Sequence, residues 1–377
     1  MKTRVAINGF GRIGRIAFRI ALERDDIEVV GINDLTDTAH LAYLLKHDSN
    51  YGDLDHEVGS DEKSIIVDGK HIPIHAEKDP TLLPWGEEKV DVVIESTGRF
   101  TDSESASAHI KAGAKKVVIS APGKGEDVKT VVIGANDDEL GKAGGVISNA
   151  SCTTNSIAAL MDIMDREFGI EKAMLTTVHS DTASQTLTDA PTKDVREGRA
   201  AAQNIVPTTT GAAIAVALTV PSMHGKFDGL SVRVPTPVVS LSDVTMLLKR
   251  DASKEDINEA LKKASKDPYY QGILGYSEEP LVSRDYVGNP HSGTVDSLLT
   301  NVVAGNLAKV VVWYDNEWGY SNRLVELVAD VGRLLHADGG HEEHKEHHEG
   351  HEGGEHKEHH EEHHEHHEHH DGHHHEG

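Results

Sequence analysis

The sequence predicts an α/β protein in which a doubly wound parallel sheet is followed by an α+β domain with a mixed or antiparallel sheet. Short runs of β-branched residues alternate with longer helical patterns along the first 150 residues. These runs are too apolar for one face to lie in water, which is typical of parallel strands covered by helices on both faces. After about residue 173 the segments lengthen and turn residues become frequent, which favours antiparallel or mixed pairing. The apolar runs are 4–7, 28–32, 91–94, 116–119 and 130–133.

Helices are expected between these strands and in the second domain. Apolar residues from 13 to 21 recur with the spacing of one helical stripe. Second-domain strands are expected at 230–237 and 243–248, and a helix capped by Ser253 is expected at 254–265. A final helix at about 320–335 could return to the first domain. The expected divisions are 1–151 together with 317–336 as the first domain, 152–316 as the second, and 338–377 as a tail.

Composition excludes several classes of function. The 377 residues include 37 Lys and Arg against 63 Asp and Glu, which gives a net charge of −26. Nucleic acids and anionic membranes both require basic surfaces, so neither is an expected partner. No apolar run approaches the roughly 18 residues of a membrane-spanning helix, and no signal-peptide pattern is present. The single cysteine excludes an intrachain disulfide and suits a reducing cytoplasm.

A dinucleotide-binding motif follows the first predicted strand. Residues 9–14 read G-F-G-R-I-G, and Asp34 lies at the end of the next strand. The first glycine permits a tight turn, the second lets a pyrophosphate approach the backbone, and the third lets the helix pack on the strand. Asp34 would bind a ribose diol and repel a 2′-phosphate, which favours NAD over NADP. The alternative is a structural strand-to-helix turn, which requires neither the acid nor this order of elements.

The one cysteine lies at the start of a predicted helix. Cys152 follows a strand and precedes a helical pattern at 156–168. A helix N-terminus stabilises a thiolate, and the hydroxyls of Ser151 and Thr153 could bind an anionic oxygen there. The residues alone leave a nucleophile and a small buried cysteine equally open. A nucleophilic thiol needs a base, and His179, which ends a second-domain strand, is the best candidate.

Several motifs occur together in this chain, and with them the sequence resembles phosphorylating glyceraldehyde-3-phosphate dehydrogenase of the NAD-dependent type. The resemblance runs from about residue 3 to residue 333. The motifs are N-G-F-G-R-I-G-R at 8–15, S-N-A-S-C-T-T-N at 148–155, H-S at 179–180, P-T-T-T-G-A-A at 207–213, R-V-P-T-P at 233–237 and W-Y-D-N-E-W-G-Y at 313–320.

The resemblance implies a cytoplasmic, homotetrameric enzyme of glycolysis or gluconeogenesis, with a Rossmann-type NAD domain and a catalytic domain. Cys152 would attack the aldehyde of D-glyceraldehyde 3-phosphate, and His179 would take up the proton and activate the thiol. The hemithioacetal would lose hydride to NAD, and inorganic phosphate would convert the resulting thioester to 1,3-bisphosphoglycerate. Thr182 and Arg233 match the site for the substrate phosphate. The site for the attacking phosphate is matched by Ser151, Thr153, Thr210 and Gly211.

The resemblance also implies the cofactor contacts. Arg12 and Ile13 match pyrophosphate contacts, and Asp34 matches the contact to the adenosine ribose. Asn316 matches the contact to the nicotinamide carboxamide, and Tyr320 would pack near that ring. The full set is Gly9, Phe10, Gly11, Arg12, Ile13, Gly14, Asp34, Lys78, Thr97 and Phe100 (the last three around the adenine), Ser120 (nicotinamide-side loop), Asn316 and Tyr320.

Four positions depart from the family's pattern. Ser156 replaces a frequent second cysteine, so no disulfide with the nucleophile can form. Lys78 stands where Arg is frequent, which keeps the charge but loses the planar fork. Ala190 stands where larger residues are frequent, which leaves some use of NADP open. Asp181 replaces an aromatic residue that is common in some branches, which could alter loop packing in the tetramer.

The last part of the chain has a different chemistry. Residues 341–377 hold 17 of the 27 histidines, among Glu and Gly and without any aliphatic residue. A segment of this kind buries too little apolar area to order, so disorder is expected from residue 338 onward. Imidazoles beside carboxylates suit Ni²⁺, Zn²⁺ or Cu²⁺, whereas no metal is expected in the core. A metal-buffering or pH-responsive segment and a solubilising or expression-related tail are equally open. The densest candidates are His359, His360, His363, His364, His366 and His367.

Two other functions are alternatives. Erythrose-4-phosphate dehydrogenase, a related enzyme, ends its reaction in hydrolysis, and the phosphate-site hydroxyls favour phosphorolysis instead. A metal-handling protein on an inactive dehydrogenase scaffold is the second alternative. Loss of Cys152 or His179 would have indicated that function, and both residues are present.

Overall fold

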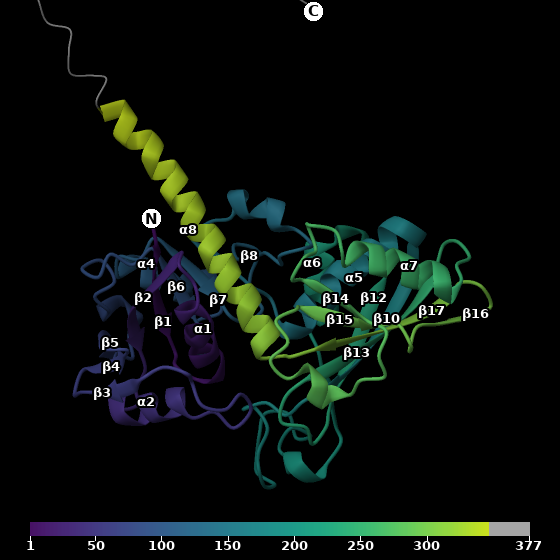
Figure 1. The fold of residues 1–377 in the computed structure, drawn as a ribbon, viewed down its shortest axis with the longest axis horizontal. Coiled ribbons are helices and arrows are strands. Elements are labelled where there is room, and N and C mark those ends of the chain that lie inside the picture. Colours follow the sequence, from purple (N-terminus) through teal and green to yellow (C-terminus); the bar gives the residue numbers. More distant parts are fainter. Residues whose placement is uncertain (347–377) are drawn as a thin grey trace, which may run out of the picture. The chain divides into compact units, whose positions relative to one another are not determined.

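The computed structural model describes the backbone of residues 1–346 and the side chains of residues 1–337. Residues 1–336 form one compact unit that contains two large sheets (Figure 1). No helix within the described residues is long and apolar enough to cross a membrane. The tail was expected to be disordered from residue 338, but the last helix continues to Glu346. The rest of that prediction, at 347–377, lies outside the described residues.

The first sheet has nine strands and is mostly parallel. Its strands are β1 (Thr3–Asn8), β2 (Ile27–Asn33), β3 (Val58–Ser60), β4 (Ser64–Val67), β5 (Lys70–His75), β6 (Val92–Glu95), β7 (Lys116–Ile119), β8 (Lys129–Thr130) and β9 (Val146–Ser148), in the order β3-β4-β5-β2-β1-β6-β7-β9-β8. Only β3, β4 and β5 pair in antiparallel fashion, at one edge of the sheet. This confirms the predicted doubly wound sheet and adds three strands to it.

Helices and turns cover both faces of this sheet. They are α1 (Arg12–Leu22), α2 (Thr38–Lys46), α3 (Ser103–Ala106), α4 (Ala108–Lys111) and the 3-10 turns η1 (Pro80–Leu82) and η2 (Asp137–Lys142). Val5 and Ile7 of β1 pack in one core with α1 and α2, whereas Ala6 between them packs in another core with Trp85 and Ala106. Strands buried on both faces explain why the sequence runs are apolar throughout.

The second sheet has eight strands with mixed pairing, as predicted. Its strands are β10 (Ile170–His179), β11 (Val206–Thr209), β12 (Phe227–Arg233), β13 (Ser240–Leu248), β14 (Leu274–Ser277), β15 (Gly293–Asp296), β16 (Asn301–Val303) and β17 (Leu307–Tyr314). β10 pairs with β12 in parallel and with β13 in antiparallel fashion. The register of the parallel pair places His179 opposite Arg233.

One face of the second sheet is covered by helices. These are α5 (Cys152–Phe168), α6 (Ala212–Thr219) and α7 (Lys254–Ala264). The 3-10 turns in this part of the chain are η3 (Ala201–Gln203), η4 (Pro221–Met223) and η5 (Ser283–Tyr286). Leu175 of β10 packs beneath α5, whereas its neighbours Met174 and Thr176 are exposed on the other face. A strand with this alternation buries every second side chain. Ser253 caps α7 through a capping box, which confirms the predicted cap.

The last helix, α8 (Trp318–Glu346), packs against the first sheet. Leu324, Val325 and Leu327 join the core that contains α1 (Figure 1). Asp315 stabilises the start of this helix, because Oδ1 accepts the amides of Glu317 at 3.0 Å and Trp318 at 2.8 Å. The helix therefore begins close to the predicted residue 317 but extends well beyond 336.

Two predicted strands were too long. The strand expected at 130–133 ends at Thr130, because the Val132 amide donates to Oδ1 of Asn136 at 2.8 Å instead of to a neighbouring strand. The strand expected at 230–237 ends at Arg233 and begins earlier, at Phe227. Two prolines follow at 235 and 237, and proline has no amide hydrogen to donate to a ladder.

Candidate active site

Parallel strands bring the predicted site residues to one edge of the first sheet. β1, β2, β6, β7 and β9 run in the same direction, so their carboxyl ends share an edge. In doubly wound sheets ligands bind outside this edge. A predicted site residue follows each of these strands: Gly9, Asp34, Thr97, Ser120 and Cys152.

The three glycines have the geometry that their predicted roles require. Gly9 has a φ of +91°, which residues other than glycine rarely adopt. A Cβ on Gly14 would lie 2.1 Å from the carbonyl oxygen of Gly9, so only glycine lets α1 approach β1 this closely. A Cβ on Gly11 would meet nothing within 4 Å. Open space above the second glycine at a helix N-terminus is what a bound pyrophosphate needs.

A cavity of about 310 Å³ opens beside these glycines. Six predicted cofactor residues line it: Gly9, Gly11, Asp34, Lys78, Thr97 and Phe100. Asn8, Asn33, Glu77 and Ser96 also line it and were not among the predicted residues. Asparagines at the ends of two apolar strands were the available signal, because parallel strands end at the ligand edge.

Two motif side chains do not reach this cavity. The Phe10 ring is buried in the core, with its centroid 5.6 Å from that of Phe18. Only its amide faces the site, where it donates to Oδ2 of Asp34 at 2.8 Å. Ile13 packs against the same core. The backbone of these two residues is therefore the part available for the predicted cofactor contacts.

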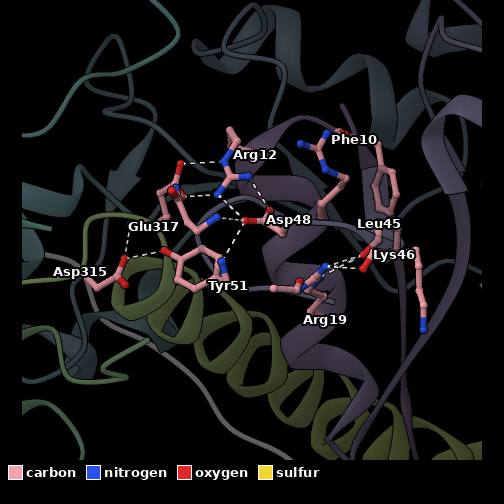
Figure 2. A network of polar contacts seen from close by, with 12 residues as sticks. Phe10, Arg12, Arg19, Leu45, Lys46, Asp48, Tyr51, Asp315 and Glu317 are labelled. Carbon is pink, nitrogen blue, oxygen red and sulfur yellow. Dashed lines mark hydrogen bonds and ion pairs between the residues drawn. The ribbon is translucent and has the colours of Figure 1, made fainter. Parts of the chain in front are cut away.

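The Arg12 side chain is engaged by carboxylates. Its Nε donates to Oε1 of Glu317 at 2.8 Å, and its Nη1 lies 2.5 Å from Oδ2 of Asp48 (Figure 2). Burial alone would lower the pKa of Arg12, but Glu317 and Asp48 together raise it. The guanidinium is thus held by protein groups, and the backbone of Arg12 at the start of α1 is the part left for a phosphate.

The same network reaches the segment that carries Asn316. Tyr51 donates its hydroxyl to Oδ1 of Asp315 at 2.8 Å, and its amide donates to Oδ1 of Asp48 at 3.2 Å (Figure 2). These contacts join the loop after α2 to the residues just before α8. The N-terminus of α1 and the segment 315–317 are therefore held together by one set of polar contacts.

Cys152 is the first residue of α5. Ser151 caps this helix, because its Oγ accepts the Thr154 amide at 3.1 Å. Ala150 before it has a φ of +56°, which turns the chain sharply from β9 into the helix. The thiol is half-buried, and its Sγ lies 3.5 Å from Nε2 of His179. Burial raises the pKa of the Cys152 thiol, and the Arg233 charge and hydrogen bonds from Thr153 oppose that rise.

His179 is a buried, neutral imidazole. Its Nδ1 lies 2.8 Å from the carbonyl oxygen of Ser180 and 2.5 Å from Nη1 of Arg233. Burial and the neighbouring Arg233 charge lower the pKa of His179 to about 3. A neutral ring has one donor and one acceptor nitrogen, so only one of the two Nδ1 contacts is a hydrogen bond at a time. Nε2, which faces the sulfur, therefore carries the proton when Nδ1 accepts from Arg233, and it lacks the proton when Nδ1 donates to Ser180.

The predicted phosphate residues divide into two groups. Arg233 lies beside the thiol–imidazole pair, and its Nε has no hydrogen-bond partner among the described residues. Thr182 is partly exposed two residues after Ser180. Thr210 and the exposed Gly211 precede α6, where the Thr210 Oγ1 accepts the Ala212 amide at 3.2 Å.

Thr153 has a partner that the sequence did not indicate. Its side chain is buried, and its Oγ1 lies 2.9 Å from the Tyr314 hydroxyl, which also contacts Oγ1 of Thr177 at 2.8 Å. These contacts connect α5 to β17 and β10. The same hydroxyl also forms a hydrogen bond with the Cys152 thiol. Its expected role at the site of the attacking phosphate stays a prediction.

Asn316 and Tyr320 are both buried near the catalytic pair. Oδ1 of Asn316 accepts the hydroxyls of Ser180 at 3.0 Å and Ser240 at 3.1 Å, which leaves its NH₂ group to donate elsewhere. Tyr320 donates its hydroxyl to the carbonyl oxygen of Ala150 at 3.0 Å. These bonds connect Asn316 and the first turn of α8 to Ser180, which follows the imidazole in the chain, and to Ala150, which precedes the thiol.

Comparison with known proteins identifies this arrangement. Residues 3–103 match the NAD binding domain of glyceraldehyde 3-phosphate dehydrogenase, and residues 151–316 match the C-terminal domain of the same family. The chain belongs to the glyceraldehyde-3-phosphate dehydrogenase family. This confirms the predicted resemblance, the fold class and NAD as the cofactor.

Relatives named glyceraldehyde-3-phosphate dehydrogenase match nearly end to end. The protein of Geobacillus stearothermophilus is 55% identical over 330 residues, which cover 87% of this chain and 98% of the relative. The protein of Streptomyces coelicolor is 53% identical over 337 residues, with coverages of 89% and 100%. The protein named glyceraldehyde-3-phosphate dehydrogenase 1 of Bacillus subtilis is 52% identical over 334 residues, with coverages of 88% and 99%.

Proposed function

We infer that this chain is a glycolytic enzyme that oxidises D-glyceraldehyde 3-phosphate with NAD and inorganic phosphate to 1,3-bisphosphoglycerate. The observation that carries this inference is the contact of 3.5 Å between Sγ of Cys152 and Nε2 of His179 at the ligand edge of a dinucleotide-binding sheet. A thiol beside an imidazole is the arrangement that thioester chemistry requires. Family membership supplies the substrate class.

The thiol forms the covalent adduct. The Cys152 sulfur attacks the aldehyde carbon, and the thiol proton moves to Nε2 of His179 while the new C–S bond forms. NAD, when bound, would supply the hydride acceptor for the oxidation of this adduct. The product at Cys152 is a thioester, which conserves the energy of oxidation. Inorganic phosphate then attacks the thioester carbonyl, the C–S bond breaks, and the sulfur is released as the thiolate.

The surrounding donors position two anions. Arg233, with its unpaired Nε, and Thr182 would bind the substrate phosphate. Ser151, Thr210, Gly211 and the backbone of Thr153 would hold the attacking phosphate. The net charge of −26 repels anions at long range, so these local donors have to outweigh it at the site.

NAD would lie along the ligand edge of the first sheet. Lys78, Thr97 and Phe100 would surround the adenine in the cavity, and Asp34 would accept the ribose hydroxyls. The amides at the start of α1 would bind the pyrophosphate. The Asn316 NH₂ group would donate to the nicotinamide carboxamide, with Ser120 and Tyr320 nearby. Residues 1–151 with 317–336 would then form the NAD domain, and 152–316 the catalytic domain.

Turnover measured with and without phosphate tests the reaction. NADH formation from glyceraldehyde 3-phosphate should require phosphate, and acid production without phosphate would contradict phosphorolysis. Cys152→Ser should reduce turnover by at least about a thousandfold, because the hydroxyl is a far weaker nucleophile, while leaving the Kd of NAD unchanged. Ser156→Ala, a substitution one helical turn away, is the matched control and should retain activity.

We also propose a homotetramer. Four apolar side chains lie exposed on the face of the second sheet that the helices leave uncovered: Met174, Val178, Leu230 and Leu307. An exposed group of apolar side chains often marks a protein–protein interface. A second copy of the chain would cover this face. Analytical ultracentrifugation should give the mass of four chains, and Met174→Glu with Leu230→Glu should lower it. Leu82→Glu, an exposed residue away from this sheet, should leave the mass unchanged.

The His-rich tail would bind divalent transition metals. The proposal depends on its composition alone, because residues 347–377 lie outside the described structure. Calorimetric titration with Ni²⁺ or Zn²⁺ should show binding in the full chain and none after removal of residues 341–377. Turnover should be nearly unchanged by the same removal. The single cysteine supports a reducing cytoplasm as the place where the enzyme works.

A further inference from the structure

The carboxylate of Glu95 is buried at the end of β6 and accepts four hydrogen bonds. Oε1 accepts the Thr97 amide at 2.9 Å and also the Thr97 hydroxyl. Oε2 accepts Nδ2 of Asn8 at 2.5 Å and Nε2 of His109 at 2.9 Å. The side chains of Glu95 and His109 are both 0% exposed. A charge this deeply buried is tolerated only where its hydrogen bonds are complete.

The direction of each hydrogen bond to Glu95 is determined. Trp85 donates Nε1–H to Nδ1 of His109 at 3.0 Å, and an indole nitrogen can only donate. The ring proton of His109 therefore lies on Nε2 and is donated to Glu95. All groups that face Glu95 are donors, so this position accepts an ionised carboxylate and no other side chain of that size.

The cluster continues into the walls of the cofactor cavity. Oδ1 of Asn8 accepts Nδ2 of Asn33 at 2.7 Å. Asn33 in turn donates to the carbonyl oxygen of Glu77 and accepts its amide, each at 2.9 Å. Asn8, Asn33, Glu77 and Thr97 all line the cavity, whereas Glu95, His109 and Trp85 do not. Glu95 thus joins three wall segments that come from separate parts of the chain.

We propose that Glu95 is a positioning residue for NAD, which acts through Thr97 and Asn8 and is itself held by His109 and Trp85. This inference rests on the proposed location of NAD in the cavity. Side chains fixed before binding need no further ordering when the cofactor arrives, which increases affinity. Neither Cys152 nor His179 lines this cavity, so the cluster should affect cofactor affinity and leave the chemical step unchanged.

Glu95→Gln tests the proposal. A glutamine amide has one accepting and one donating end, so one pair of donors, either Thr97 or Asn8 with His109, must face an NH₂ group. His109 cannot move its proton to Nδ1, because Trp85 occupies that nitrogen. We expect the Kd and KM of NAD to rise about tenfold, with kcat at saturating NAD within about twofold of the wild type.

Glu88→Gln is the matched control. Glu88 also pairs with a histidine, since its Oε1 lies 2.8 Å from Nε2 of His75, but it does not line the cavity. It should leave the Kd of NAD unchanged. Equal NAD affinity in Glu95→Gln and Glu88→Gln would overturn the proposal. A fall in the kcat of Glu95→Gln with an unchanged KM of NAD would overturn it as well.

Two further variants distinguish a wrong location for NAD from a wrong role for Glu95. If Asp34→Ala leaves the Kd of NAD unchanged, NAD does not lie in this cavity and the proposed site is wrong. If Asp34→Ala weakens binding and Glu95→Gln does not, only the role of Glu95 is wrong. Should Glu95→Gln fail to fold, Trp85→Phe decides, because it removes the donor that fixes the His109 proton. A rise of about threefold in the Kd of NAD with kcat kept supports the proposal, and an unchanged Kd overturns it.

Discussion

Nη1 of Arg233 lies 2.5 Å from Nδ1 of His179, whose other nitrogen faces the Cys152 sulfur at 3.5 Å. A guanidinium can only donate, so while this contact lasts the ring proton lies on Nε2, towards the sulfur. If Arg233 turns to a substrate phosphate, Nδ1 becomes free to donate to the carbonyl oxygen of Ser180. Nε2 is then unprotonated and can accept the thiol proton. The residue proposed to bind the substrate phosphate would thus also determine whether His179 can act as the base.

Arg233→Gln should therefore affect both substrate and thiol. Loss of the guanidinium removes a charge that lowers the pKa of the Cys152 thiol, so that pKa should rise further. We expect the KM of glyceraldehyde 3-phosphate to rise by at least about tenfold and alkylation of Cys152 by iodoacetamide at pH 7 to slow severalfold. Arg250→Gln is the control, because Arg250 packs over the ring of Phe168 at the end of α5 opposite Cys152. Unchanged alkylation in Arg233→Gln would contradict the electrostatic effect.

His179 should make stability depend on pH. Its pKa is lowered to about 3 from an ordinary 6.5, so between these values the unfolded chain binds a proton that the folded chain does not. The contribution of the neutral His179 ring to the unfolding free energy is therefore fully present above pH 6.5 and is lost as the pH falls towards 3. Relative to His179→Gln, the wild type should lose about 1.4 kcal/mol of unfolding free energy per pH unit in this range. Urea unfolding at pH 7, 6, 5 and 4 measures this difference, and parallel curves would contradict it.

Gly11→Ala and Gly14→Ala should fail in different ways. A Cβ at 14 would collide with the Gly9 carbonyl oxygen at 2.1 Å, so α1 must shift, and we expect a loss of about 2 kcal/mol or more of stability. A Cβ at 11 meets nothing within 4 Å, so the Tm should change little. The same methyl group would occupy the space of the pyrophosphate, so the Kd of NAD should rise at least about tenfold. Normal NAD affinity in folded Gly11→Ala would place the pyrophosphate elsewhere.

Asp48→Asn and Glu317→Gln should loosen the contacts of Arg12. The Asp48 side chain is 3% exposed and that of Glu317 is 14% exposed, so each change leaves a largely buried guanidinium partly unpaired. We expect each to lower the unfolding free energy by about 2 kcal/mol. Because Glu317 adjoins Asn316, Glu317→Gln should also raise the KM of NAD. Arg166 and Asp162 form an exposed pair on α5, and Asp162→Asn should cost less than about 0.5 kcal/mol.

Local sequence signals predicted the parts of the site that are local in structure. Gly9, Gly11 and Gly14 lie close together in the sequence. Gly9 has a positive φ, and Gly14 has no room for a Cβ. Cys152 was placed at a helix start from the pattern on either side of it. The strand at 130–133 was predicted too long because the apolar residues continue, whereas the Asn136 side chain that ends the pairing gives no such pattern.

Contacts between distant residues gave no sequence signal. Thr153 is 161 positions from Tyr314, and nothing near either residue indicated the contact between their hydroxyls. Glu95 is 87 positions from Asn8, so nothing near either residue indicated the cluster beneath the cavity. The strands β3, β4 and β5 were missed because they are short and partly exposed, and so lack the continuous apolar character of their parallel neighbours.

Ser156 lies one turn after Cys152 and donates its hydroxyl to the carbonyl oxygen of Thr153 at 2.8 Å. With serine there, an oxidised catalytic sulfur has no neighbouring thiol with which to form a reversible internal cross-link. A sulfenic acid at Cys152 would be repaired only by a small thiol or a reducing protein from the surroundings, in competition with further, irreversible oxidation. Survival of the enzyme under peroxide would therefore depend on the supply of reductant in its host.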